Sequence, residues 1–234
     1  MLHGLDLFSG IGGIGYALKD YVKTVAYCEI GRYPQAVLLS LMEDKKIQQC
    51  PIWDDVKTFP SDTFKGHIDI IFAGFPCQDI SVAGHGIGLD GKRSRLFFEI
   101  MRISEKIKPS FIFLENVSAI ISRDGLRVVT EIAKIGYDCR WCTLSAASVG
   151  AHHKRDRWFL LAHSRRFSKG RSEDTKKPSL YASRCCWERE TEPKMDRVVD
   201  DVPYRVDRIK SLGNSVVPRQ VKVAFETLMG LNTK

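Results

Sequence analysis

The chain has 234 residues, which is enough for one large α/β domain with a small appendage. Its hydrophobic content of 44% allows a substantial core, and its formal net charge of +8 favours a polyanionic partner without proving one. No apolar run reaches about 18 residues and the first residues lack a signal-peptide pattern, so we expect neither a membrane span nor secretion. Seven cysteines without framework spacing indicate reduced thiols in a cytoplasm.

Short apolar runs alternate with helical patterns along the first two thirds of the chain. We expect strands at residues 5–8, 22–28, 68–72 and 111–114, and helices at residues 14–20, 34–43 and 126–135. Strands that are apolar on both faces and separated by helices are typical of a parallel sheet covered on both sides. The predicted fold is therefore a doubly wound, mostly parallel α/β sheet.

The remaining segments are more varied. Residues 139–145 and 157–162 are predicted to form a hairpin joined through residues 150–154, and residues 217–228 a helix after a turn at residues 213–215. The glycine-rich residues 78–92 are predicted to form a loop that closes over a site. From residue 164 apolar residues become sparse and positive charges exceed negative ones, which fits either a disordered linker or a small binding insert.

A glycine-rich turn at residues 8–15 follows the first predicted strand and opens a helix. Such a turn lets a ligand approach the backbone, and the helix start offers unpaired N–H groups. About twenty residues later, Glu29 ends the next strand, where an acidic side chain can bind ribose hydroxyls. The turn alone is equally compatible with an ordinary strand-to-helix connection. The extra Gly13 makes a dinucleotide less favoured, so the pattern indicates a nucleoside ligand.

Cys77 follows a buried strand in the segment Gly74–Phe75–Pro76–Cys77, at the sheet edge where open α/β folds bind ligands. A free cysteine is often only a small buried apolar residue, but Pro76 and the glycine-rich stretch favour exposure. Glu115 follows another apolar strand and is either a proton donor that faces the same cleft or, with Asn116, a helix cap. A thiol paired with a carboxylate suits addition to an electron-poor ring.

At these residues the sequence resembles the cytosine-5 DNA methyltransferase family. The resemblance rests on residues 6–13, on Gly74–Gln78 with Ser81, on Glu115–Val117, on residues 153–157 and on residues 213–218. It implies a fold of the S-adenosylmethionine-dependent methyltransferase type, with S-adenosylhomocysteine as the product. The cofactor-binding residues that it implies are Phe8, Ser9, Gly10, Gly12, Gly13, Glu29, Ile30, Asp55, Val56, Pro76, Asn214, Ser215 and Val216.

The resemblance also implies a mechanism on a cytosine flipped out of duplex DNA. Cys77 adds to C6 of the base, Glu115 contacts N3 and the exocyclic amine, and C5 takes the methyl group. Arg157 helps to hold the base, and Arg155 belongs to the same catalytic motif. Gln78, Ser81, Arg93 and Arg95 are the implied DNA contacts, although the two arginines fit solvated surface charges equally well.

The sequence departs from the family where target recognition is expected. Only residues 164–203 are available between the catalytic residues 1–163 and the returning residues 204–234, which is too short for an independent core. The usual motif before the last one is replaced by residues 196–208. Compact enzymes of bacteriophage and prophage type carry similar segments, so the shortening puts sequence specificity, rather than activity, in doubt.

Metal binding is not expected. Adjacent His152 and His153 would point to opposite faces of a strand, and the pairs Cys139/Cys142 and Cys185/Cys186 lack zinc-knuckle geometry. We expect a cytoplasmic monomer that acts on double-stranded DNA. A tRNA cytosine-5 methyltransferase and a catalytically inactive DNA-binding relative are the two alternatives.

Overall fold

Strands in the described part of the chain form one sheet in the order β3-β2-β1-β4-β5-β7-β6. The computed structural model describes residues 1–76, 96–168 and 205–231. The strands are β1 (Leu2–Leu7), β2 (Val22–Cys28), β3 (Ile52–Trp53), β4 (Ile70–Gly74), β5 (Phe111–Val117), β6 (Tyr137–Ser145) and β7 (Asp156–Ser164).

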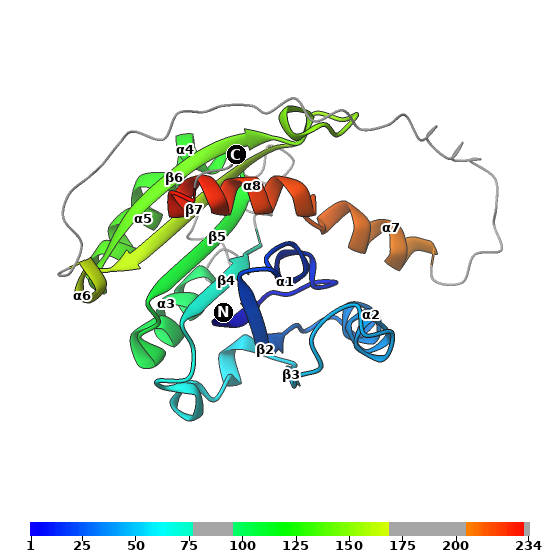
Figure 1. Cartoon of the computed structure of the whole chain (residues 1–234), viewed down its shortest axis with the longest axis horizontal. Coiled ribbons are helices and arrows are strands. Elements are labelled where there is room, and N and C mark those ends of the chain that lie inside the picture. The colour runs from blue at the N-terminus through cyan, green and yellow to red at the C-terminus, as the bar shows by residue number, and fades with distance from the viewer. Residues whose placement is uncertain (77–95, 169–204, 232–234) are drawn as a thin grey trace.

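The sheet is parallel from β3 to β5 and antiparallel at its other edge. β1 pairs in parallel with β2 and β4, β2 with β3, and β4 with β5. β7 lies antiparallel between β5 and β6, so the predicted hairpin is confirmed and its second arm inserts next to the parallel strands. The expected doubly wound, mostly parallel sheet is confirmed (Figure 1).

Helices cover both faces of this sheet (Figure 1). They are α1 (Gly13–Ala17), α2 (Arg32–Glu43), α3 (Leu96–Ile107), α4 (Ile120–Arg123), α5 (Gly125–Lys134), α6 (Arg165–Ser168), α7 (Arg205–Asn214) and α8 (Pro218–Met229). The described residues also form the short 3-10 helices η1 (Val56–Thr58), η2 (Ser61–Phe64) and η4 (Ala147–Val149).

The side chains of each central strand point alternately into two apolar cores, as the period of two requires. Leu5 and Leu7 of β1 join the core beneath α3 and α5. On the other face, Phe72 of β4 and Phe113 of β5 pack beneath α1 and α8. All four side chains are fully buried, so the sheet edge that follows these strands is held rigidly from both sides.

α8 ties the end of the described chain back to its beginning. Its buried residues Val221, Ala224, Phe225 and Leu228 recur with helical spacing and form one apolar face. Pro218 occupies the first turn, where its missing N–H costs nothing, and Gly230 ends the helix with a left-handed φ of 71°. This face packs against the same core as α1, which brings residues 214–216 close to the glycine turn.

Several expectations need correction. Residues 213 and 214 end the helix α7 instead of forming a turn, because the chain stays helical from Arg205 to Asn214. The helix expected at 14–20 already ends at Ala17, where Leu18 leaves helical geometry. His152 and His153 lie in the connection between β6 and β7, so the argument from opposite strand faces does not apply to them. α3 and α7 were not predicted.

Candidate active site

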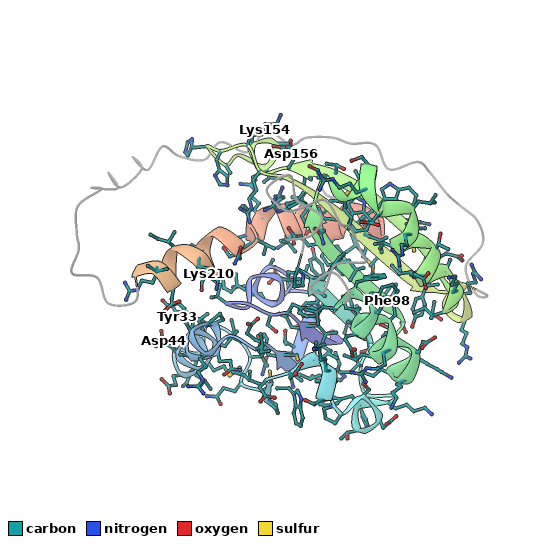
Figure 2. All side chains as sticks on the ribbon, turned by 180° about the vertical axis from the view of Figure 1, so that it is seen from behind. Tyr33, Asp44, Phe98, Lys154, Asp156 and Lys210 are labelled. Carbon is teal, nitrogen blue, oxygen red and sulfur yellow. The ribbon has the colours of Figure 1, made fainter. Side chains whose placement is uncertain are left out.

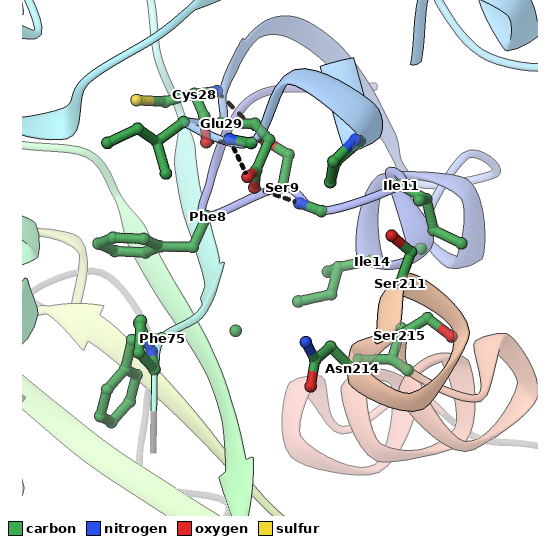
Figure 3. A pocket seen from close by; sticks show the side chains of 18 of the residues that line it. Phe8, Ser9, Ile11, Ile14, Cys28, Glu29, Phe75, Ser211, Asn214 and Ser215 are labelled. Carbon is green, nitrogen blue, oxygen red and sulfur yellow. Dashed lines mark hydrogen bonds between the residues drawn. The ribbon is translucent and has the colours of Figure 1, made fainter. Parts of the chain in front are cut away.

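A cavity of about 1110 Å³ opens at the carboxyl ends of β1, β2, β4 and β5. Figure 3 shows that the glycine turn and Glu29 form one wall, while Ser211, Asn214 and Ser215 form the wall opposite. Its lining includes these residues predicted to bind cofactor: Phe8, Ser9, Gly10, Gly13, Glu29, Ile30, Asp55, Val56, Pro76, Asn214, Ser215 and Val216. Glu115, Arg155 and Arg157 line the same cavity.

The glycine turn presents bare backbone to this cavity. Gly10 has a left-handed φ of 53°, and a Cβ built on it would meet nothing within 4 Å. A ligand can therefore approach the peptide at Gly10 closely. Phe8, immediately before, also has a positive φ of 54°, a strained conformation for a bulky residue that is typical of functional sites.

Glu29 fixes the shape of this turn. Its Oε2 accepts a hydrogen bond from the Gly10 N–H over 2.8 Å, and its Oε1 accepts one from the Gly31 N–H over 2.7 Å (Figure 3). One carboxylate thus bridges the ends of β1 and β2. Each oxygen keeps a further lone pair for a ligand.

Ser9 and Gly12 support the turn from behind. The Ser9 hydroxyl donates to the Asp6 carbonyl over 2.8 Å and accepts from the Cys28 N–H over 3.2 Å, so it joins β1 to β2. Gly12 lies outside the lining. Its φ is 80°, and a Cβ there would come within 2.9 Å of the Leu38 side chain on α2.

Ile30, Asp55 and Val56 form a third part of the lining. The Ile30 side chain is 74% exposed, so it offers an apolar surface to the cavity without burying itself in the core. Asp55 caps η1, where its side chain accepts from the Lys57 N–H over 3.0 Å. Val56 is buried and belongs to the core below.

A buried ion pair joins the ends of β5 and β7. The Nε of Arg157 lies 2.8 Å from Oε1 of Glu115, and both side chains are largely buried. Burial raises the pKa of Glu115, while the guanidinium groups of Arg157 and Arg155 oppose that rise. A carboxyl group whose pKa lies above its usual range is suited to carry a proton to a bound base.

The neighbouring strand end leaves room for this carboxylate. Gly74 ends β4 beside Glu115, and a Cβ on it would lie 3.2 Å from Oε2 of Glu115. Asn116, which belongs to the motif Glu115–Val117 and was a candidate helix cap, is buried, and its amide donates to the Phe75 carbonyl over 3.2 Å. Asn116 therefore anchors the chain two residues before Cys77.

Arg155 reaches a different partner from Arg157. Its Nη2 donates to the Ser215 carbonyl over 2.7 Å and to the Gly213 carbonyl over 3.1 Å. The start of β7 is thereby joined to the segment that connects α7 and α8.

Asn214 was predicted to bind the cofactor, but the other α7 residues in the outer wall of the cavity were not predicted. Asp207, Lys210, Ser211 and Asn214 of α7 line it, at the spacing of one helix face. Figure 2 shows Lys210 above Tyr33, which also lines the cavity from α2. The helical spacing of these four polar residues could have indicated a shared face. Polar residues at this spacing are, however, equally common on helices that are simply exposed to solvent.

Several predictions lie outside the described residues. These are the nucleophile Cys77, the closing loop of residues 78–92 and the DNA contacts Gln78, Ser81, Arg93 and Arg95. Residues 169–203 of the predicted target-recognition segment, with the pair Cys185/Cys186, lie outside them as well. Within the described ranges, no cluster of three or more His, Cys, Asp or Glu residues has the geometry to hold a metal ion. None of the helices described is both long and apolar enough to cross a membrane.

The strand order and the cavity at the carboxyl edge define the class as the α/β fold of methyltransferases. The structure is similar to a prophage-encoded chain of E. coli, with a TM-score of 0.58 at 21% identity, covering 77% of this chain and 51% of that one. It is also similar to the S. pombe Dnmt2 methyltransferase, with a TM-score of 0.56 at 21% identity, covering 75% of this chain and 58% of that one.

The chain belongs to the C-5 cytosine-specific DNA methylase family, whose model matches residues 2–201. It is 37% identical over 226 residues to the type II methyltransferase M.CviJI of Paramecium bursaria Chlorella virus IL3A, covering 96% of this chain. It is 33% identical over 165 residues to the type II methyltransferase M.HhaI of Haemophilus parahaemolyticus, covering 68% of this chain. The chain spans 58% and 48% of the lengths of these two relatives.

Proposed function

We propose that this chain transfers a methyl group from S-adenosylmethionine to carbon 5 of a cytosine in double-stranded DNA. The observation that carries the proposal is the buried Glu115–Arg157 pair, which lines the same cavity as the Gly10–Glu29 turn. One cavity thus holds a nucleoside-type cradle and a carboxyl group with a raised pKa. Pro76, which also lines it, is followed directly by Cys77.

The cofactor end of the cavity fits S-adenosylmethionine. Open space in front of Gly10 admits a ligand against the backbone, and Glu29 offers free lone pairs for ribose hydroxyls. The exposed Ile30 provides an apolar surface for an adenine ring. When bound, the cofactor supplies an electrophilic methyl group on a sulfonium.

The base end is assigned to the cytosine. The Cys77 thiolate adds to C6, and the displaced electron pair makes C5 nucleophilic while Glu115 donates a proton or hydrogen bond at N3. C5 then takes the methyl group, a base removes the C5 proton, and expulsion of the thiolate restores the ring. Arg157 holds Glu115 in place throughout, and Asn116 anchors the Phe75 peptide near Cys77.

The parts of the chain are assigned as follows. Residues 1–163 and 204–234 supply the catalytic domain, and residues 164–203 contact the target sequence. Gln78, Ser81, Arg93 and Arg95 bind the DNA around the flipped base, and the enzyme acts as a monomer without a metal ion.

The test is methyl transfer from labelled cofactor to random-sequence duplex DNA and, separately, to tRNA. Label in the DNA, lost in Cys77→Ser but kept in Cys139→Ser, is the expected result. Label in tRNA alone would replace the DNA proposal with the tRNA alternative. No label in either, together with intact cofactor binding, would favour a non-catalytic binding protein.

A further inference from the structure

Gln220 is a buried polar side chain that no motif of the sequence singled out. It lies in the first turn of α8 and is only 1% exposed. Its Nε2 donates two hydrogen bonds, one to the Leu144 carbonyl over 2.8 Å and one to the Arg155 carbonyl over 2.7 Å. Both acceptors belong to the β6–β7 hairpin, so a single amide fixes both arms to the C-terminal helix.

The carbonyls of Leu144 and Arg155 lie beside the start of β7, the strand that carries Arg157. Leu144 pairs directly with Arg157 in the β6–β7 ladder, and Arg155 precedes Arg157 by two residues. The position of the Arg157 backbone, and therefore the reach of its guanidinium to Glu115, depends on this end of the hairpin.

Through Arg155, the hydrogen bond from Gln220 also connects to the cofactor side of the cavity, and the linked groups form a ring. Arg155 donates from Nη2 to the carbonyls of Gly213 and Ser215, while its own carbonyl accepts from Gln220. The ring therefore runs from α8 to β7 and back to the segment immediately before α8. The three hydrogen bonds that make it up join residues 58, 60 and 65 positions apart in the sequence.

A displacement of residues 213–216 would also displace the glycine turn. Val216 follows Ser215 and lines the cavity, and its Cγ2 lies 2.9 Å from where a Cβ on Gly13 would be. The wall that carries Asn214, Ser215 and Val216 thus packs directly on the turn. Close-packed contacts of this kind transmit small displacements.

We infer that Gln220 is a positioning residue that holds the cofactor wall of residues 213–216 and the Arg157–Glu115 pair in one rigid frame. The inference deepens the proposed function and rests on it. Removal of the amide leaves the Leu144 and Arg155 carbonyls without this donor and frees the hairpin end from α8. Gln220 touches neither base nor cofactor in this account and acts through Arg155 and the segment that Arg155 holds.

The test is S-adenosylhomocysteine binding measured by calorimetry on the full chain, well below the melting temperature of each variant. Gln220→Leu removes both donated hydrogen bonds while keeping an apolar side chain of similar size, and we expect about tenfold weaker binding. Gln220→Glu keeps the side-chain shape, but its carboxylate cannot donate, so binding should weaken at least as much. Either variant suffices if the other does not fold.

Lys222→Gln is the matched control on the same helix. It removes an exposed ion pair with Asp20 and should leave the dissociation constant within about twofold of the wild-type value. In a double-mutant cycle, Gln220→Leu should add little to the loss caused by Arg155→Met, because both break the same ring.

Wild-type affinity in a Gln220 variant with a lowered melting temperature would overturn the inference and leave a purely structural residue. Fully additive losses in the cycle would overturn it as well, because the two side chains would then act independently. A wild-type chain that does not bind S-adenosylhomocysteine at all would contradict the proposed function itself.

Discussion

The Nε of Arg157 lies 2.8 Å from Oε1 of Glu115, across the antiparallel junction of β7 with β5. This pair orients a carboxyl group that stands beside Gly74 at the end of β4, three residues before Cys77. The antiparallel insertion of β7 is what brings an arginine to the end of a parallel strand.

Arg157→Met should abolish most methyl transfer and destabilise the fold, because it leaves the Glu115 carboxylate buried without its ion-pair partner. Breaking a buried pair by removing one partner costs about 3 kcal/mol in the free energy of unfolding at neutral pH. Arg165→Met, which breaks an exposed pair with Asp138, should cost under about 1 kcal/mol. Urea unfolding of both variants measures the difference.

The loss in the free energy of unfolding caused by Arg157→Met should depend on pH. The pKa of Glu115 is already raised in the folded protein, and loss of Arg157 raises it further. When the pKa of a carboxyl group is higher in the folded than in the unfolded protein, the protein becomes less stable as pH rises. This loss begins at the unfolded pKa of about 4.5 and is complete above the folded pKa. The deficit relative to wild type should therefore be larger at pH 8 than at pH 5, and a deficit that shrinks with rising pH would contradict this.

Asp6→Asn should flatten the fall in stability with rising pH. Asp6 is 1% exposed beneath the glycine turn, and burial raises its pKa well above the usual range. Ionisation of this group is costly in the folded state, so its contribution to stability falls once pH exceeds its unfolded pKa. Asparagine mimics the neutral form. Unfolding curves from pH 4 to pH 8 should converge at the acid end and separate at the alkaline end, with the variant more stable there.

Glu29→Gln should weaken S-adenosylhomocysteine binding by at least about tenfold with little effect on DNA binding. The amide oxygen can replace only one of the two carboxylate oxygens that accept from Gly10 and Gly31, and the new NH₂ group faces an N–H donor. Calorimetry measures the dissociation constant of S-adenosylhomocysteine. Glu43→Gln, at an exposed position near the end of α2, is the control and should bind normally.

Gly74→Ala should lower the rate of methyl transfer more than it lowers cofactor affinity. The added Cβ would lie 3.2 Å from Oε2 of Glu115, so this carboxylate must move by a few tenths of an ångström. Catalysis depends on the exact placement of a reacting group, so this shift should lower the rate of methyl transfer. Single-turnover rates and calorimetry on one preparation separate the two effects, and equal losses in both would contradict the assignment.

The sequence was sufficient for the local parts of this structure. The run Val22–Cys28 was predicted with the bounds that β2 has, and the hairpin arms lie within β6 and β7. Apolar runs and glycine turns encode such elements locally. The insertion of β7 between β5 and β6 was not predicted, because strand order depends on packing between distant segments.

The candidate site shows the same division. Glycine spacing and the acid at the next strand end located Gly10 and Glu29, whose contact the structure then supplies. The roles of Gln220 and of Asp207, Lys210 and Ser211 on α7 were missed, as was the hydrogen bond by which Asn116 anchors Phe75. Asn116 and Gln220 act through hydrogen bonds to distant segments, such as the bond from Asn116 to Phe75 across 41 residues. The α7 residues line the cavity because the folded chain brings this helix opposite the glycine turn.

The most direct measurement is covalent trapping on duplex DNA in which 5-fluorocytosine replaces cytosine. Fluorine at C5 cannot leave as a proton does, so an enzyme that adds Cys77 to C6 and transfers the methyl group stays attached to the DNA. We predict a cofactor-dependent protein–DNA adduct for the wild type that is absent in Cys77→Ser and present in Cys139→Ser. An adduct that survives Cys77→Ser, or no wild-type adduct on random-sequence duplex, would contradict the account.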